Sequence, residues 1–541
     1  MDTLLPPELL VRIFKDLRNM FAQPSETEPH ELDALKWLPV NRVCRSWRQA
    51  ALGDPTLWTH ISMWDDNFDC VRTFVERSRP QLLYVRVPVG LRKRTETNNR
   101  TVLRLVMGEA YRVRHLEVGW HYMARYGNRS SLNKMCNVGI LCLCAFPSLQ
   151  ELCLRSVDIE RTSLVALLAA CPQLRKLVIM VDPWGDDTLR PTVEMWCDAL
   201  EEMPHLEHLL LEHAFGTGLE QIHGGEYTRS PLRLDNLRTL SIHYPPLQQS
   251  AWFFRSLSIP STASMQVKYN GSENIRQDIA CAFAAIAACR SRNKKCKLIS
   301  LDLDECSGAA LEVSCWDTAL QMPLCSGEPS LLTEDMRTHL LLRISLDLMC
   351  FSEIEDRYGH YMEISDMLQN AFIFTDAVSL RIGSRWFEQD TDEPGTAGLA
   401  SLSTQEYRTV CREMNHVKTL AISGDVTPQQ INCMLGMDPG RPPSAAPFTL
   451  QCPPLFPRLE ELTLHNMCLW PSWEVPSDIP YDQVLRAVDV RKALGCGIRS
   501  LRIWDIQDGE LDGPVYAQLR AAVPELDVQR SSTCPCHSSK A

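Results

Sequence analysis

A short leucine pattern that returns along most of the chain constrains its fold more than any other feature. The pattern places apolar residues at its first, fourth and sixth positions, as in Leu149-x-x-Leu152-x-Leu154. The alternation that closes it is typical of a short strand with one buried face. Clear copies cover residues 149–154, 174–179, 206–211, 237–242, 298–303, 417–422, 459–464 and 498–503, and weaker copies cover 113–118 and 377–382.

Helical patterns fill the intervals between these expected strands. Leu164, Leu167 and Leu168 form one apolar stripe, Val193 and Trp196 belong to another, and comparable stretches cover 275–290, 404–415 and 481–494. A strand, loop and helix repeated in this way cannot bury their apolar faces alone, so neighbouring units must stack. The predicted fold class is therefore α/β, an open solenoid of parallel strands backed by helices. A closed α/β sheet is the competing fold, and the repeated leucines favour the open array.

The segment before residue 62 carries a dense set of large apolar side chains. Leu10, Ile13, Phe14 and Leu17 recur at the spacing of one helix face. A second helix is expected from near Pro39, with its apolar face formed by Val40, Val43, Cys44, Trp47 and Ala51. This segment is too short to enclose much core of its own. A partner protein is the simplest explanation of its apolar surface.

Three motifs in a fixed order make this segment resemble an F-box over roughly residues 4–62. They are the run from Leu5 to Leu17, then Val43-Cys44-Arg45-Ser46-Trp47-Arg48, then Asp54-Pro55-Thr56-Leu57-Trp58. The resemblance implies a three-helix segment that docks on the Skp-type adaptor of a cullin–RING ubiquitin ligase. The adaptor contacts that it implies are Leu5, Pro6, Leu9, Ile13, Phe14, Val43, Cys44 and Trp47. The acidic insert at 23–30 is longer than a compact F-box usually has, which an exposed loop tolerates at small entropic cost.

The repeats resemble leucine-rich repeats of the long, irregular kind often found behind F-boxes. Regular repeats place Asn or Cys three residues past the third leucine. Cys306 occupies that place, whereas five of the other copies have Val157, Asp182, Ala214, Met467 and Ile506. An uneven array is therefore expected, with long loops at 215–233, 388–400 and 436–457. The predicted domains are an F-box at 1–62 and an irregular leucine-rich-repeat-like solenoid at 63–541.

Charge and cysteine context favour an intracellular protein that binds other proteins. The net charge of −12, from 55 basic and 67 acidic residues, argues against a broad nucleic-acid surface. No basic-then-apolar signal precedes the first amphipathic helix, and the apolar run from Ile279 to Cys289 is shorter than the ~20 residues of a membrane span. We therefore expect reduced cysteines, a cytoplasmic or nuclear location, and neither nucleic acid nor membrane as a partner.

Motifs for catalysis or cofactor binding were not found. The sequence has no phosphate-binding loop, no dinucleotide fingerprint and no His-Glu-x-x-His helix. Cys534, Cys536 and His537 are too tightly spaced for a four-ligand zinc site. We therefore expect a protein that is not an enzyme and that uses no cofactor or metal.

Side chains between the buried leucines should point to the outer face of the predicted sheet, where mixed polarity suits protein recognition. They are Glu151, Cys153, Arg155, Lys176, Met180, His208, Glu212, Ser241, His243, Asp302, Asp304, Glu461, His465, Arg502 and Trp504. The leading hypothesis is a ubiquitin-ligase substrate receptor whose repeats hold an unidentified target protein. The alternatives are an F-box scaffold outside ubiquitin transfer and an α/β enzyme with a chance F-box resemblance.

Overall fold

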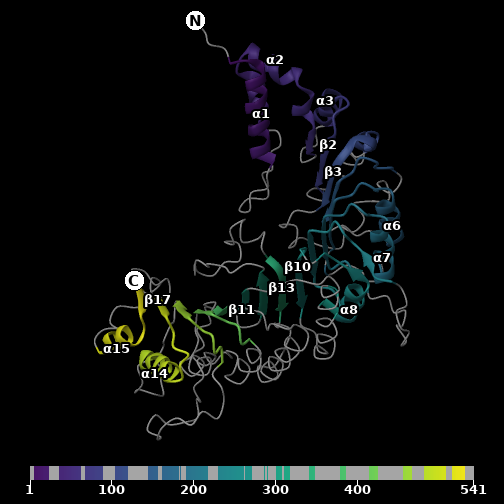
Figure 1. Cartoon of the computed structure of the whole chain (residues 1–541). Helices are drawn as coiled ribbons and strands as arrows, with labels where there is room; N and C mark the ends of the chain where they lie inside the picture. The colour runs from purple at the N-terminus through teal and green to yellow at the C-terminus, as the bar shows by residue number, and fades with distance from the viewer. Residues whose placement is uncertain are drawn as a thin grey trace, which may run out of the picture. The chain divides into compact units, whose positions relative to one another are not determined.

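The computed structural model divides the chain into two compact units, Met1–Pro245 and Pro246–Ala541 (Figure 1). The structure describes residues 5–22, 36–62, 68–88, 101, 104–119, 144–155, 161–181, 183, 190–216, 230–260, 262–270, 285–286, 289, 300–306, 310–316, 340–347, 378–385, 414–423, 455–465, 480–506 and 514–530. Predictions that lie outside these residues concern the insert at 23–30, the loop at 388–400, most of the loop at 436–457, and Val157, Asp182, Met467, Cys534, Cys536 and His537.

The described part of the N-terminal segment is helical, but its second helix differs from the prediction. Its elements are the α-helices α1 (Pro7–Ala22) and α2 (Arg45–Gly53) and the 3-10 helices η1 (Leu38–Arg42) and η2 (Pro55–Trp58). The expected single helix from near Pro39 is wrong because the chain is extended at Cys44, with φ −157° and ψ 172°. There the Cys44 sulfur accepts a hydrogen bond from the Trp47 amide, which caps α2.

Aromatic packing gives this segment a small core that continues beyond it. The ring centroids of Trp37 and Trp58 are 5.3 Å apart, and those of Trp58 and Phe74 are 5.0 Å apart. Phe74 belongs to helix α3 (Phe68–Ser78). The Trp58 indole N–H donates to the Ala51 carbonyl at 3.0 Å, which satisfies its polar atom inside the core. The N-terminal helices and α3 therefore share one hydrophobic cluster.

Seven strands of the first unit pair in parallel, and their order in space follows their order in the sequence. They are β1 (His60–Ser62), β2 (Leu83–Pro88), β3 (Val113–Gly119), β4 (Glu151–Arg155), β5 (Lys176–Met180), β6 (His208–Glu212) and β8 (Thr239–His243). The 3-10 helix η3 (Ala110–Arg112) precedes β3, and a short strand β7 (Leu232–Arg233) precedes β8. Helices α6 (Arg161–Ala169) and α7 (Val193–Glu201) connect successive strands and lie side by side (Figure 1).

The strand register aligns the leucines of successive repeats into continuous apolar rows. Leu152, Leu177, Leu209 and Leu240 are direct register partners, and each is buried. A second buried row, two residues further along each strand, contains Leu154, Ile179, Leu211 and Ile242. In these rows each leucine covers the leucines of the adjoining strands. The parallel strands that follow the N-terminal helices confirm the predicted α/β class.

A tight turn precedes several of these strands and was not identified from the sequence. The Leu174 amide donates to the Cys171 carbonyl at 3.2 Å, and Leu206 donates in the same way to Met203. Proline follows the first residue of both turns, where its fixed φ is favourable. The structural repeat therefore begins three residues before the leucine pattern, with a further buried side chain.

The second unit contains an antiparallel strand that the sequence pattern did not predict. Its sheet runs in the order β10 (Ser264–Asn270), β13 (Leu340–Asp347), β12 (Ala310–Trp316), β11 (Ser300–Cys306), β14 (Ser379–Arg385), β15 (Thr419–Ser423), β16 (Glu461–His465), β17 (Ser500–Ile506) and β18 (Glu525–Arg530). Strand β12 is antiparallel to both β11 and β13, whereas the other neighbours are parallel. The expectation of parallel strands alone is therefore wrong here. Because only a short connection separates β11 from β12, these two strands pair as a hairpin.

The structure describes three helices in the second unit, one of which was predicted. They are α8 (Leu247–Arg255), α14 (Pro480–Ala493) and α15 (Pro514–Ala522), and a short strand β9 (Leu257–Ser258) follows α8. Helix α14 occupies the stretch expected at 481–494. The stretches expected at 275–290 and 404–415 lie largely outside the described residues.

The close packing of β3 and β4 at Gly119 leads to a prediction about stability. A Cβ atom on Gly119 would lie 2.5 Å from the Arg155 Cβ and 2.7 Å from the Arg155 carbonyl oxygen on the adjacent strand. We expect Gly119→Ala to lower the free energy of unfolding by about 1–3 kcal/mol, because the strands must move apart. Urea denaturation of the full chain measures the change.

Gly53 is the matched control for that substitution. It ends α2, and an added Cβ would meet no atom within 4 Å. Gly53→Ala should leave stability equal or slightly raised, because alanine restricts the unfolded chain. Equal unfolding free energies for Gly119→Ala and the wild type would contradict the close approach of β3 and β4.

Candidate functional site

Helix α1 has apolar side chains on a buried face and also on an exposed one. Leu10 and Phe14 are buried, whereas Leu9 and Ile13 are each 46% exposed and Met20 is 71% exposed. Leu9, Ile13 and Met20 share one side of the helix, because spacings of four and seven residues return to the same face. The helix therefore offers an apolar surface that its own unit leaves uncovered in the described structure.

Exposed apolar side chains concentrate in this part of the described chain. Those before residue 60 are Leu5, Leu9, Ile13, Met20, Val43 and Leu52, and those elsewhere are Leu82, Tyr111 and Leu494. Scattered exposed apolar residues are ordinary, but a concentration of them marks an interaction surface. The N-terminal helices are therefore the strongest candidate for a protein contact.

The predicted adaptor contacts divide into exposed and buried side chains. Leu5, Pro6, Leu9, Ile13, Val43 and Cys44 are exposed, and Trp47 is half-buried. Phe14 needs correction, because its side chain has no exposed surface and its ring centroid lies 5.3 Å from that of Trp47. Phe14 therefore supports the surface from beneath. Met20 shares the exposed face of α1 with Leu9 and Ile13 and was not among the predicted contacts, although this spacing was visible in the sequence.

Polar and aromatic residues form a continuous outer row across the strands of the first unit. His60, Tyr84 and His115 begin it, with ring centroids 4.6 Å apart for the first pair and 6.2 Å for the second. The row continues through successive register partners Glu151, Lys176, His208 and Thr239. These side chains therefore face the same side of the sheet at the same height.

Ion pairs tie the outer face of β2, β3 and β4 together. Glu117 Oε2 lies 2.9 Å from Arg86 Nε, and Glu117 Oε1 lies 3.2 Å from Arg155 Nε. Burial alone would raise the pKa of Glu117, but the His115 ring, 3.8 Å away, and the two arginine charges outweigh it and lower the pKa to about 2. The Glu117 carboxylate is therefore charged and balanced by its neighbours.

Glu151 is paired in a similar way. Its Oε2 atom lies 3.0 Å from Nδ1 of His115. Burial would lower the pKa of His115, but the Glu117 carboxylate, 3.8 Å from its Nε2 atom, and the hydrogen-bonded Glu151 outweigh burial and raise it. The pKa of Glu151 is lowered, chiefly by the hydrogen bond from His115. This coupling favours a protonated imidazole beside a charged carboxylate.

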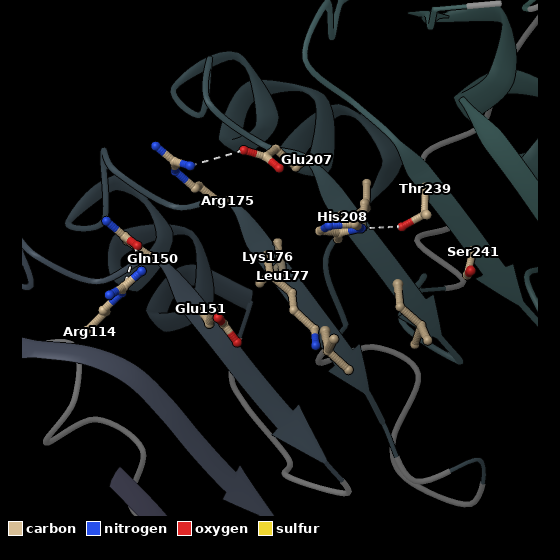
Figure 2. Close-up of a pocket in the computed structure, with 13 residues that line it drawn as sticks. Arg114, Gln150, Glu151, Arg175, Lys176, Leu177, Glu207, His208, Thr239 and Ser241 are labelled. Carbon is tan, nitrogen blue, oxygen red and sulfur yellow. Dashed lines mark hydrogen bonds and ion pairs between the residues drawn. The ribbon is translucent and has the colours of Figure 1, made fainter. Parts of the chain in front are cut away.

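An open groove of about 550 Å³ lies over β4, β5, β6 and β8 (Figure 2). Val178 and Leu210 contribute apolar surface to it, and Arg175, Lys176, Glu207 and His208 contribute polar groups. Burial lowers the pKa of His208, and its Nδ1 atom shares a 2.8 Å hydrogen bond with the Thr239 hydroxyl. His208 therefore lines the groove as a neutral ring.

A second polar row crosses the start of these strands. Arg114 Nε donates to Gln150 Oε1 at 2.9 Å. Glu207 forms ion pairs with two guanidinium groups. Its Oε1 atom lies 3.3 Å from Arg175 Nη1, and its Oε2 atom lies 3.4 Å from Arg238 Nε. Figure 2 shows the Arg114–Gln150 and Arg175–Glu207 contacts at the edge of the groove. All five residues directly follow the first apolar residue of the leucine pattern, a recurrence that was readable in the sequence.

The residues predicted to face a target are mostly accessible where the structure describes them. Glu151, Arg155, Lys176, Met180, His208, Glu212, Ser241, Glu461 and Arg502 are exposed or half-buried. Cys153 and His243 need correction, because both are buried. His243 Nδ1 lies 3.2 Å from Glu212 Oε2, so that pair is structural. The side chains of Asp302, Asp304, His465 and Trp504 lie outside the described part.

His60, in the outer row, should make the folding stability of the protein depend on pH. Burial, with the charges of Arg18 and Arg86, lowers the pKa of His60 from 6.5 to about 3. Between these values the unfolded chain binds a proton at His60 that the folded chain does not. This histidine therefore reduces stability by about 1.4 kcal/mol for each pH unit of acidification within that window.

His60→Phe should remove that slope, because phenylalanine preserves a ring beside Tyr84 without a titrating nitrogen. Urea unfolding at pH 6.5, 5.5 and 4.5 compares the two proteins. His115 acts in the opposite direction, since a raised pKa adds stability that is lost as pH rises, but it is present in both. Parallel pH profiles for wild type and variant would contradict a buried neutral His60.

Within the described residues, no cluster of three His, Cys, Asp or Glu side chains is arranged to hold a metal ion. No helix in the same part of the chain has the length and apolar character needed to cross a membrane.

Comparison with known protein families finds matches for two parts of the chain. Residues 3–64 match the F-box-like family, and residues 130–224 match a family described as the LRR repeats of an FBD-associated F-box protein. A search of curated proteins found no match. The first match contains α1 and α2, and the second contains β4, β5 and β6. The chain therefore carries an F-box-like domain at its N-terminus and, behind it, a segment similar to the leucine-rich repeats of an F-box protein.

Proposed function

We propose that this chain is the substrate-recognition subunit of an SCF-type cullin–RING E3 ubiquitin ligase. The observation that carries the proposal is the uncovered apolar face of α1 inside the F-box-like domain. Leu10 and Phe14 already supply the buried side of that helix, so Leu9 and Ile13 remain for an external partner. The family match supports a Skp-type adaptor as that partner.

The proposed role needs no catalytic group in this chain. F-box and leucine-rich-repeat families typically contain binding subunits rather than enzymes. Holding a target beside the ubiquitin-charged enzyme raises its effective concentration, which makes transfer to its lysines nearly intramolecular. We propose that the chain does this in the cytoplasm or nucleus, with the adaptor on α1 and the target on the repeats.

Co-purification tests the adaptor contact. The full chain and a Skp-type adaptor, produced together, should elute as one complex in size-exclusion chromatography. Separate elution at micromolar concentration would contradict the proposal. A scaffold outside ubiquitin transfer would also bind the adaptor, so the second measurement is the half-life of captured proteins in cells with and without this chain. Unchanged half-lives for every captured protein would favour the scaffold.

A further inference from the structure

We propose that the groove over β4, β5, β6 and β8 binds an extended, acidic peptide segment of the target protein. This inference rests on the proposed receptor function and adds the chemical class of the target. The anionic groups on that segment are side-chain carboxylates or phosphates, which share the chemistry that arginine and lysine recognise.

The groove has the dimensions of a short extended peptide. Adjacent strands lie about 4.8 Å apart, so the four strands span roughly 14 Å between the outer pair. A peptide that crosses them needs about four or five residues at ~3.3 Å each. Val178 and Leu210 place apolar surface beside the polar Lys176 and His208. A peptide with alternating apolar and charged side chains matches that arrangement.

The charges of the groove are not balanced within the described structure. Glu207 already accepts both Arg175 and Arg238, and Glu151 is paired with His115. Lys176 and Arg114 form no direct ion pair with any described carboxylate, although their charges help to lower the pKa of Glu151. The side chain of Arg114 donates a hydrogen bond to the neutral Gln150. The two lining carboxylates are therefore occupied, and positive charge remains for a ligand.

This local surplus contrasts with the chain as a whole, whose net charge is −12. Charges separated by more than about 8 Å are largely screened at physiological salt, so the groove presents its own positive field at contact distance. An acidic segment gains attraction there. A basic segment meets like charges, and an apolar one covers Lys176 without a counter-charge, so both are disfavoured.

A peptide-selection experiment tests the inference on the full chain, alone and bound to the Skp-type adaptor. An array of hexapeptides varies each position among Asp, phosphoserine, Asn, Leu and Lys. We expect the bound peptides to be enriched in Asp or phosphoserine, with binding that weakens as salt rises. The ratio of phosphoserine to Asp peptides separates modification-dependent recognition from recognition of carboxylates.

Charge reversal locates the binding site. The double variant Arg175→Glu, Lys176→Glu should weaken the binding of acidic peptides by about tenfold or more, because two cations become anions. The preference should shift toward peptides that contain Lys. Arg458→Glu is the matched control, since Arg458 is exposed in the second unit, outside the groove. Lys176→Gln only removes a charge and should weaken the binding of the same peptides by a few fold. This single variant keeps the test valid if the double variant misfolds.

The inference is overturned if the array shows no acidic preference, or if both groove variants bind acidic peptides as the wild type does. Adaptor co-purification is read from the same samples as an independent measurement. Adaptor binding without acidic selection would reject the peptide site alone. Acidic selection by a chain that binds no adaptor would reject the ligase role and leave the groove assignment standing.

Discussion

Replacing Leu9 and Ile13 together by aspartate should abolish binding of the Skp-type adaptor. Each side chain is 46% exposed on the same face of α1, so the free protein loses little packing. In the complex, two carboxylates would be buried against an apolar partner without counter-charges. Burying a charge in this way is strongly unfavourable, and we expect at least about a hundredfold loss of affinity. Isothermal titration with purified adaptor measures it.

Leu82→Asp is the control for that double variant. Leu82 is 39% exposed and lies outside the F-box-like domain, so its replacement should leave adaptor affinity unchanged. Circular dichroism should show the same helix content in the wild type and both variants. Retention of wild-type affinity by the Leu9→Asp, Ile13→Asp chain would move the adaptor contact away from α1.

Trp47→Ala is a poorer test of the same contact. Trp47 is only partly accessible, and its ring packs 5.3 Å from the fully buried Phe14. Its removal leaves a cavity beside Phe14, so lost adaptor binding would mix unfolding with the loss of a contact. The exposed pair on α1 separates these effects because neither member supports the internal core.

The elements that were predictable from sequence are those in which the local apolar pattern matches the face that is buried in the structure. The leucine copies at 149–154, 174–179 and 206–211 became β4, β5 and β6 in parallel register because their buried rows cover one another. Helical spacing likewise located α1, α6 and α7. In these elements, periodicity and packing agree.

Elements that lack the leucine pattern, or that depend on contacts between distant residues, were not predicted. Strand β12 has no leucine pattern and was found only through its antiparallel pairing with β11 and β13. Phe14 and Ile13 are adjacent apolar residues, and only the packing of α1 on α2 decides that one is buried and the other exposed. Sequence periodicity identifies an apolar helix, but it does not tell which part of a wide stripe faces a partner.

The groove was missed for a related reason. Sequence reasoning placed Lys176 and His208 on the outer face, but it did not include the preceding row with Arg175 and Glu207. That row matters because Glu207 pairs with Arg175 and Arg238, so within the described structure Lys176 remains a cation without a direct ion pair. Charge balance across a sheet follows from strand register, and register is a tertiary property.

Leu177→Ala should cause the largest loss of stability among these substitutions. Leu177 is fully buried between its register partners Leu152 and Leu209, so truncation removes contacts on both sides and leaves a cavity. We expect the free energy of opening of β4–β6 to fall by about 3 kcal/mol. Hydrogen exchange with mass spectrometry measures this change strand by strand.

Leu177→Ala also connects the apolar row to the groove. Leu177 is flanked in β5 by Lys176 and Val178, and all three residues line the groove. Loosening β5 should therefore weaken acidic-peptide binding, although the substitution leaves every groove charge in place. Leu494→Ala is the control, because Leu494 is an exposed leucine in the second unit and should change neither measurement. Wild-type exchange rates in β4–β6 of Leu177→Ala would show that the leucine rows do not hold the strands that form the groove.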